Sequence, residues 1–143
     1  MTQFLSGISV VLLGAIGWFA LEFVGRPIRS FFDLRRETGR QMFFLANVAP
    51  VEFVDDHIRA ADPAHQRSIA AVQNVEKTFR DLGTQLLAFG ESEWPASRLV
   101  KLAGFDATAA GNALIGFSNN ANVYGAEKAE FRRRVGQALR FKN

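Results

Sequence analysis

The chain opens with an unbroken apolar run and continues with apolar positions that recur every three or four residues. Between Thr2 and Leu21 no side chain is ionisable, and the first charged side chain is that of Glu22. An apolar run of about 20 residues, when helical, matches the thickness of the hydrocarbon core of a bilayer. The pattern therefore predicts a transmembrane anchor over residues 1–25, with Trp18 and Phe19 at the membrane interface.

A signal peptide or a buried core helix would fit this run less well. A cleavable signal peptide has a basic start and small residues at a cleavage site. Here the α-amino group alone precedes the run, and no A-x-A pattern follows it. A buried core helix of this length usually carries some polar residues, so the membrane span remains the preferred interpretation.

Three glycines, Gly7, Gly14 and Gly17, place small residues on part of the anchor's surface. Gly7 and Gly14 are seven residues apart and so nearly superpose along a helix axis. Small residues suit packing between membrane helices, because lipid provides no hydrophobic drive for association. They predict a helix–helix contact in the membrane, made either with a second copy of the chain or with a larger membrane protein.

The segment after the anchor combines arginines with phenylalanines. After a hinge or kink expected at Gly25-Arg26-Pro27, the pattern over residues 26–48 predicts a basic amphipathic helix. Such a helix suits a membrane surface, with its apolar side down and its cations at anionic headgroups. Packing of the same aromatic face into a helical bundle is the alternative. The residues predicted to bind the membrane surface are Arg26, Arg29, Arg35, Arg36 and Arg40.

The distribution of these charges predicts an orientation. No Lys or Arg precedes the run, whereas five arginines follow it before residue 41. By the positive-inside rule, residues 26–143 lie in the cytoplasm and a few N-terminal residues lie outside the inner membrane. The absence of cysteine agrees with a cytoplasmic domain.

Residues 49–143 form a predicted helical domain that is long enough to have its own core. Its best-defined helix starts at Asp62-Pro63, an N-cap followed by proline at the first helical position, and continues to Gly90. No segment shows the alternation of a strand, so the fold class is all-α, one membrane helix followed by a small cytoplasmic bundle. The other expected segments are an apolar stripe over 51–61, a short helix over 95–103 stopped by Gly104, a small-residue helix capped by Asp106, a turn at 118–122 and a basic helix over 126–141.

The segment Ala113-Leu-Ile-Gly-Phe-Ser-Asn119, with a helix start at Pro95-Ala96-Ser97 upstream, resembles a motif of uncharacterised bacterial membrane proteins. Those proteins join one N-terminal membrane helix to a small helical cytoplasmic domain. The resemblance implies the same arrangement for this chain and no particular activity.

The net charge of +3 and the pI of about 9.8 come from two separate basic blocks, the segment after the anchor and the C-terminal tail. Such a tail could bind nucleic-acid phosphates or anionic lipid. Alternatively, it is a solvated helix face that Glu127 and Glu130 partly neutralise. Tethering beside a membrane favours lipid, because headgroups are then at a high effective concentration. We expect no nucleic-acid partner. The basic residues of the tail are Lys128, Arg132, Arg133, Arg134, Arg140 and Lys142.

Candidate catalytic chemistry is sparse. The acid–histidine group of Asp55, Asp56, His57 and His65 is interrupted by the Asp62-Pro63 break, so its side chains need not converge on a metal. The chain has no cysteine and no G-x-S-x-G motif, and its glycines fit neither a Walker A nor a G-x-G-x-x-G pattern. We therefore expect no enzymatic activity, no metal and no cofactor.

Together these features favour a membrane-anchored interaction protein, an accessory or assembly subunit of a larger inner-membrane complex. One alternative is a small membrane-perturbing or membrane-organising protein of the toxin or lysis-factor type, suggested by the basic amphipathic segment. A second is a membrane-tethered enzyme with a site near Asp55, His57 and His65.

Overall fold

The computed structural model describes residues 13–45, 62–122 and 126–141, and all regular structure in these ranges is helical. The all-α fold class is therefore confirmed, with no strand in the described ranges. Residues 13–20 are α-helical and continue into a π-helix, η1 (Leu21–Gly25). The elements that follow are α2 (Arg26–Phe44), α4 (Pro63–Ser92), α5 (Ala96–Leu102), α6 (Ala107–Asn119) and α7 (Ala126–Ala138).

The predicted membrane span falls partly outside these ranges. Residues 1–12, with Gly7, are not among the residues that the structure describes. Within the described ranges, no helix has both the length and the apolar content needed to cross a bilayer. The apolar stripe expected over 51–61 also lies outside the described residues.

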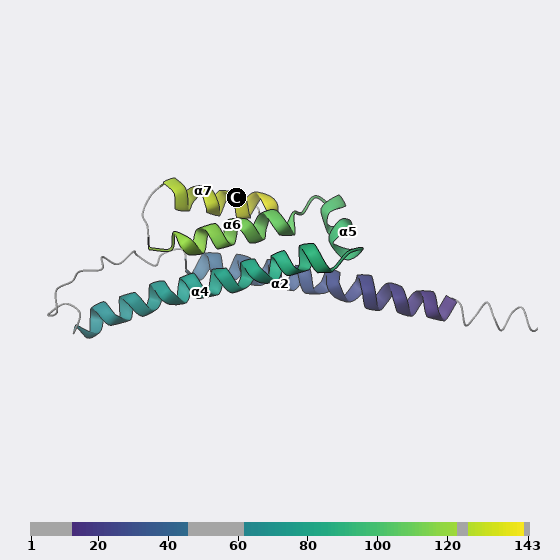
Figure 1. Ribbon diagram of the computed structural model, residues 1–143, viewed down its shortest axis with the longest axis horizontal. Coiled ribbons are helices and arrows are strands. Elements are labelled where there is room, and N and C mark those ends of the chain that lie inside the picture. Colours follow the sequence, from purple (N-terminus) through teal and green to yellow (C-terminus); the bar gives the residue numbers. More distant parts are fainter. Residues whose placement is uncertain (1–12, 46–61, 123–125, 142–143) are drawn as a thin grey trace, which may run out of the picture.

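At Gly25-Arg26-Pro27, where the sequence predicts a hinge or kink, the backbone stays helical and so does not form a hinge, but its regular α pattern is interrupted by the π-helical turn η1. Proline lacks an N–H and its ring clashes with the carbonyl four residues earlier in a regular α-helix. The chain accommodates Pro27 after a wider turn, in which the Arg26 N–H donates to the Leu21 carbonyl, five residues back. Single π-helical turns are a known way to absorb such a local misfit. Residues 13–20, η1 and α2 consequently lie nearly end to end (Figure 1).

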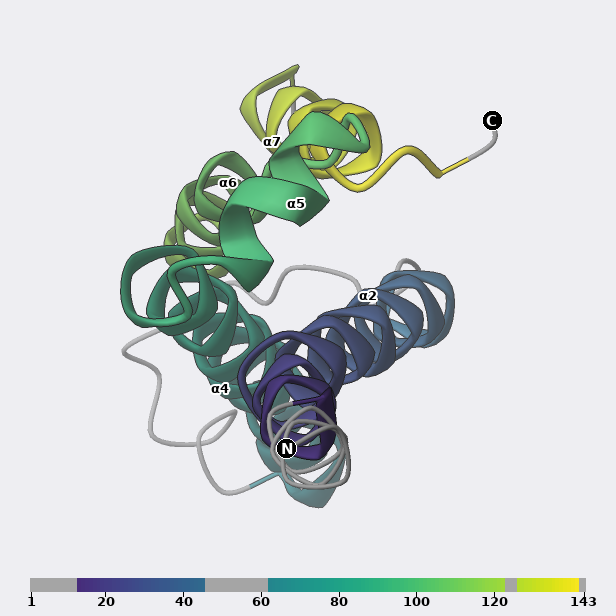
Figure 2. The same ribbon diagram turned by 90° about the vertical axis from the view of Figure 1, so that its right-hand side faces the viewer.

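The core is an antiparallel pair formed by α4 and α6, with α7 packed on α6 (Figures 1 and 2). The predicted start of α4 is confirmed, since the Asp62 carboxylate accepts a hydrogen bond from the Ala64 N–H at 2.9 Å. The predicted cap of α6 is confirmed too, by a 2.8 Å bond from the Ala109 N–H to Asp106. The buried stripe of α4 consists of Val72, Val75, Phe79, Leu82, Leu86 and Phe89.

Glycine allows α4 and α6 to approach closely. A Cβ atom on Gly83 would lie 2.9 Å from the Gly111 carbonyl oxygen, and one on Gly111 would lie 2.7 Å from the Gly83 carbonyl oxygen. Further along the pair, the buried Ser118 hydroxyl donates to the Glu76 carbonyl at 2.8 Å. Within the segment 113–119, which carries the resemblance, the side chains of Ala113, Leu114, Phe117 and Ser118 are buried.

The short helix α5 crosses the end of the bundle at which α4 finishes (Figures 1 and 2). Gly104 ends it as predicted, with φ of +88°, a left-handed conformation that glycine adopts without strain. The Phe105 N–H donates to the Val100 carbonyl and the Gly104 N–H to the Lys101 carbonyl. This pair of bonds is the Schellman arrangement of helix C-termini.

The aromatic face of α2 packs on the bundle, which is one of the two arrangements that the sequence allows. Phe31 is fully buried, with its ring centroid 5.2 Å from that of Phe89 and 5.7 Å from that of Phe105. The packing does not extend to the aromatic side chains at the C-terminal end of α2, where Phe43 and Phe44 are 78% and 66% exposed.

Candidate membrane-facing and docking surfaces

The helix preceding α2 exposes apolar side chains all around its axis over residues 13–20, and on part of its surface in η1. It extends beyond the bundle (Figure 1), and in the end-on view it projects toward the viewer (Figure 2). A Cβ atom on Gly14 or Gly17 would meet nothing within 4 Å, so both predicted packing glycines lie on open surface. The exposed side chains of this segment include Leu13, Ile16, Trp18, Phe19, Leu21 and Phe23, each at least 46% accessible.

Four of the five arginines predicted to bind the membrane surface lie on the open face of the helix. Arg26 pairs with Glu22, Arg36 with Asp33 at 3.4 Å and Arg40 with Glu37 at 2.9 Å, all one helical turn apart. Hydrogen bonds from Arg40 and Gln41 lower the pKa of the Glu37 carboxyl. Arg29 is exposed and has no ion pair in the part of the chain that the structure describes.

The fifth, Arg35, is built into the bundle. Its Nε donates to the Leu139 carbonyl at 2.8 Å and its Nη2 to the Arg140 carbonyl at 3.2 Å. Its guanidinium carbon lies 5.5 Å from the ring centroid of Phe105 and 5.2 Å from that of Phe141. Arg35 therefore satisfies carbonyl groups at the end of α7, where a cation is favourable. No local pattern marks this role, because its partners are more than 100 residues away in sequence.

The basic tail is largely engaged within the protein. Arg133 and Arg134 both bond to Glu130, at 2.7 and 2.8 Å, and these bonds lower the pKa of the Glu130 carboxyl to about 2. The Arg140 side chain donates to the Ala103 carbonyl at 2.9 Å. Lys128 donates to the Ala121 carbonyl at 3.2 Å, and partial burial lowers its pKa. Arg132 is exposed and has no ion pair within the described ranges, and Lys142 lies outside them.

A groove lies between α2 and α7. Its volume is about 540 Å³, within the usual range of binding pockets. Arg132 and Arg133 are its charged lining residues, and no carboxylate lines it. The apolar or small lining residues are Gly39, Met42, Phe43, Ala129, Gly136 and Phe141.

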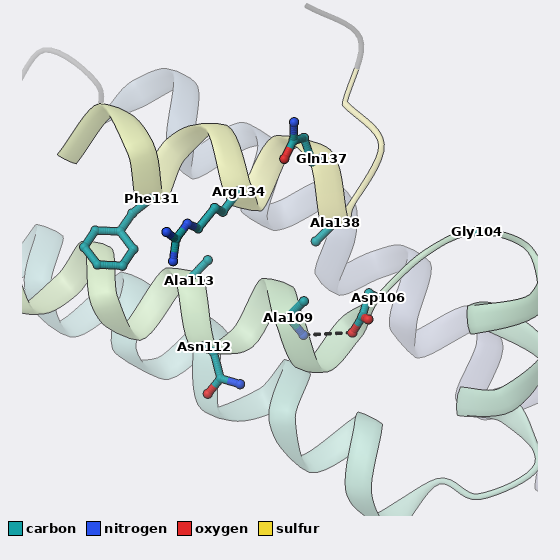
Figure 3. A pocket seen from close by; sticks show the side chains of 9 residues that line it. All are labelled: Gly104, Asp106, Ala109, Asn112, Ala113, Phe131, Arg134, Gln137 and Ala138. Atoms are coloured by element: carbon teal, nitrogen blue, oxygen red, sulfur yellow. Dashed lines mark hydrogen bonds between the residues drawn. The ribbon is translucent and has the colours of Figure 1, made fainter. Parts of the chain in front are cut away.

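A second groove, of about 560 Å³, lies between α6 and α7 (Figure 3). Its polar side chains do not converge on one point. Asn112 and Gln137 point in different directions, and Arg134 lies against α6 near Ala113 (Figure 3). The Asp106 carboxylate is occupied as the cap of α6. The groove therefore lacks the nucleophile–base pairing that catalysis requires.

The acid–histidine group cannot be assembled from the described residues. Asp55, Asp56 and His57 lie outside them, and His65 is half-buried in the first turn of α4. Among the residues that are described, no cluster of three potential metal ligands occurs.

Comparison with known proteins gave no match to a family model, a curated protein or a solved structure.

Proposed function

We propose that this chain is a membrane-anchored interaction protein, an accessory or assembly subunit of a larger complex in the inner membrane. The observation that carries the proposal is the helix over residues 13–25, whose side chains are all exposed over residues 13–20 and whose Leu21 and Phe23 are exposed further along. Burying one large apolar side chain gains about 1.5–3 kcal/mol. A helix that leaves a whole series of them exposed is explained by an apolar environment outside the chain.

The end-to-end arrangement of this helix and α2 restricts which arginines meet lipid. With a rise of about 1.5 Å per residue, Arg40 lies about 21 Å further along the axis than Arg26. If the apolar helix crosses the bilayer, α2 leads away from it. Arg26 and Arg29 then lie at the level of anionic headgroups, whereas Arg36 and Arg40 lie too far into the cytoplasm. The positive-inside rule places the bundle in the cytoplasm in this arrangement.

Two surfaces are proposed for docking. Within the membrane, open positions at Gly14 and Gly17 let a second helix approach closely. Outside it, the groove between α2 and α7 offers an apolar floor with Arg132 and Arg133 at its wall. The partner is a larger membrane protein or a second copy of the chain.

Photo-crosslinking in intact membranes tests this proposal. A photoreactive residue at Gly17 or at Phe43 should give a discrete protein adduct that mass spectrometry identifies. The matched control is the same residue at Asp81, an exposed position on α4 away from both surfaces. Absence of adducts at Gly17 and Phe43, together with a free monomer after extraction in gentle detergent, would contradict the proposal.

A further inference from the structure

We propose that α5 is a second membrane contact, a short helix that lies in the lipid interface beside the anchor. The inference rests on the proposed membrane anchor and adds a site of contact that the apolar run does not contain. Its occupant is the headgroup and upper acyl region of the bilayer.

The position of α5 in the fold is the first argument. α5 contacts both η1 and α2, so it lies at the level where the apolar helix enters the bundle. Its axis runs across the direction of that helix (Figure 1), and both face the viewer at the same end of the molecule (Figure 2). A helix at this level and in this direction lies parallel to a bilayer that the apolar helix crosses.

The side chains of α5 divide as an interfacial helix requires. Ala96 and Val100 are buried and hold α5 to the bundle. On its outer side Leu102 is 84% exposed and Leu99 is 46% exposed, and Trp94 in the preceding turn is 65% exposed. Tryptophan prefers the membrane interface, and helices with one apolar face lie in that plane.

The charges at this end predict which lipids matter. Residues 21–29 and 91–106 carry four basic and four acidic side chains, so their formal charges cancel. Contact by α5 should therefore depend on its apolar side chains and little on anionic lipid. The charged residues are Arg26, Arg29, Arg98, Lys101, Glu22, Glu91, Glu93 and Asp106.

The bundle holds α5 in place at its C-terminal end. That end is closed by the Schellman bonds around Gly104, and the Arg140 side chain donates to the Ala103 carbonyl at 2.9 Å. The adjacent Phe105 ring packs edge-on against Phe31 of α2. The exposed leucines thus belong to a fixed surface of the folded bundle, which needs no rearrangement to meet lipid.

Tryptophan fluorescence tests the inference, because the chain contains two tryptophans, Trp18 and Trp94. The full-length Trp18→Phe variant, reconstituted in phosphatidylcholine vesicles, reports on Trp94 alone. Lipid brominated near the headgroup should quench Trp94, and aqueous iodide should quench it much less than it quenches Trp94 in the unfolded chain. Adding phosphatidylglycerol should change neither result.

Three further variants separate the proposed α5 contact from the anchor. Leu102→Glu should abolish lipid quenching of Trp94, whereas Phe44→Glu, an equally drastic change at the far end of α2, should leave it intact. Trp94→Phe reports on Trp18 in the anchor. Lipid quenching of Trp18 with none of Trp94 overturns the α5 contact and leaves the anchor standing. Loss of lipid quenching at both tryptophans overturns both.

Discussion

Neighbouring arginines in α2 have opposite roles, and the sequence pattern could not distinguish them. Arg35 faces the bundle, where it bonds to the Leu139 and Arg140 carbonyls, while Arg36 faces outward with its side chain 79% exposed. Charge and spacing alone predict both at the membrane surface. Which face of α2 becomes buried depends on the chain end that packs beside it, and that end is distant in sequence.

The first prediction compares these two arginines. Arg35→Ala should lower the free energy of unfolding by about 1–2 kcal/mol, since it removes charged hydrogen bonds to two carbonyls at a half-buried helix end. Arg36→Ala should change it by less than about 0.5 kcal/mol, as expected for an exposed residue. Denaturant unfolding of the full chain in mild detergent measures both. Equal effects of the two substitutions would refute the assigned role of Arg35.

The second prediction concerns pH. Because Arg133 and Arg134 hold the pKa of Glu130 near 2, against an ordinary value of 4.5, the ion pairs are complete above pH 4.5 and are lost as pH falls through about 2. Proton titration of the Glu130 carboxyl by NMR should show this low midpoint. Replacing Arg133 and Arg134 together by Gln should return the midpoint toward 4.5, and an unchanged midpoint in that variant would rule out the pairing as its cause.

At the scale of single elements, the sequence predicts much of the bundle. The sequence predicts the helix caps Asp62 and Asp106, the end of α5 at Gly104 and the apolar stripe of α4. Each of these features depends on residues within one or two helical turns. The sequence does not predict that the helix continues through Pro27, since a π-helical turn and a helix break have the same local sequence pattern. The glycines of α4 and α6 indicate that helices approach closely, but which glycines face each other depends on the tertiary structure and cannot be predicted from the local sequence.

The third prediction uses two helical glycines in opposite surroundings. Gly83→Ala should destabilise the fold by about 1–3 kcal/mol, because its Cβ would lie 2.9 Å from the Gly111 carbonyl and overpack the contact. Gly136→Ala should stabilise it by about 0.5–1 kcal/mol, because nothing lies within 4 Å and alanine favours a helix. Thermal unfolding measures the two shifts, and shifts of the same sign would contradict the close approach of α4 and α6.

For the whole molecule, the fold joins parts that are separate in the sequence. Arg35 of the first basic block bonds to the Leu139 and Arg140 carbonyls of the C-terminal tail, and α5 lies beside the start of α2. The basic tail is exposed, as the sequence predicts, and Glu130 neutralises part of it by pairing with Arg133 and Arg134, while the Arg140 side chain bonds to the Ala103 carbonyl. No catalytic arrangement emerges from the described residues, so the surfaces of the molecule carry the functional argument.

The most direct test of membrane anchoring is the behaviour of the full chain in isolated membranes. After an alkaline carbonate wash, which strips peripheral proteins, the chain should remain in the membrane pellet, and detergent should release it. The double substitution Leu13→Lys and Ile16→Lys, at two exposed positions near the middle of the proposed span, should move it to the supernatant, because a charged side chain at the bilayer centre costs about 2.5–3.5 kcal/mol. Recovery of the unmodified chain in the carbonate supernatant would contradict membrane anchoring.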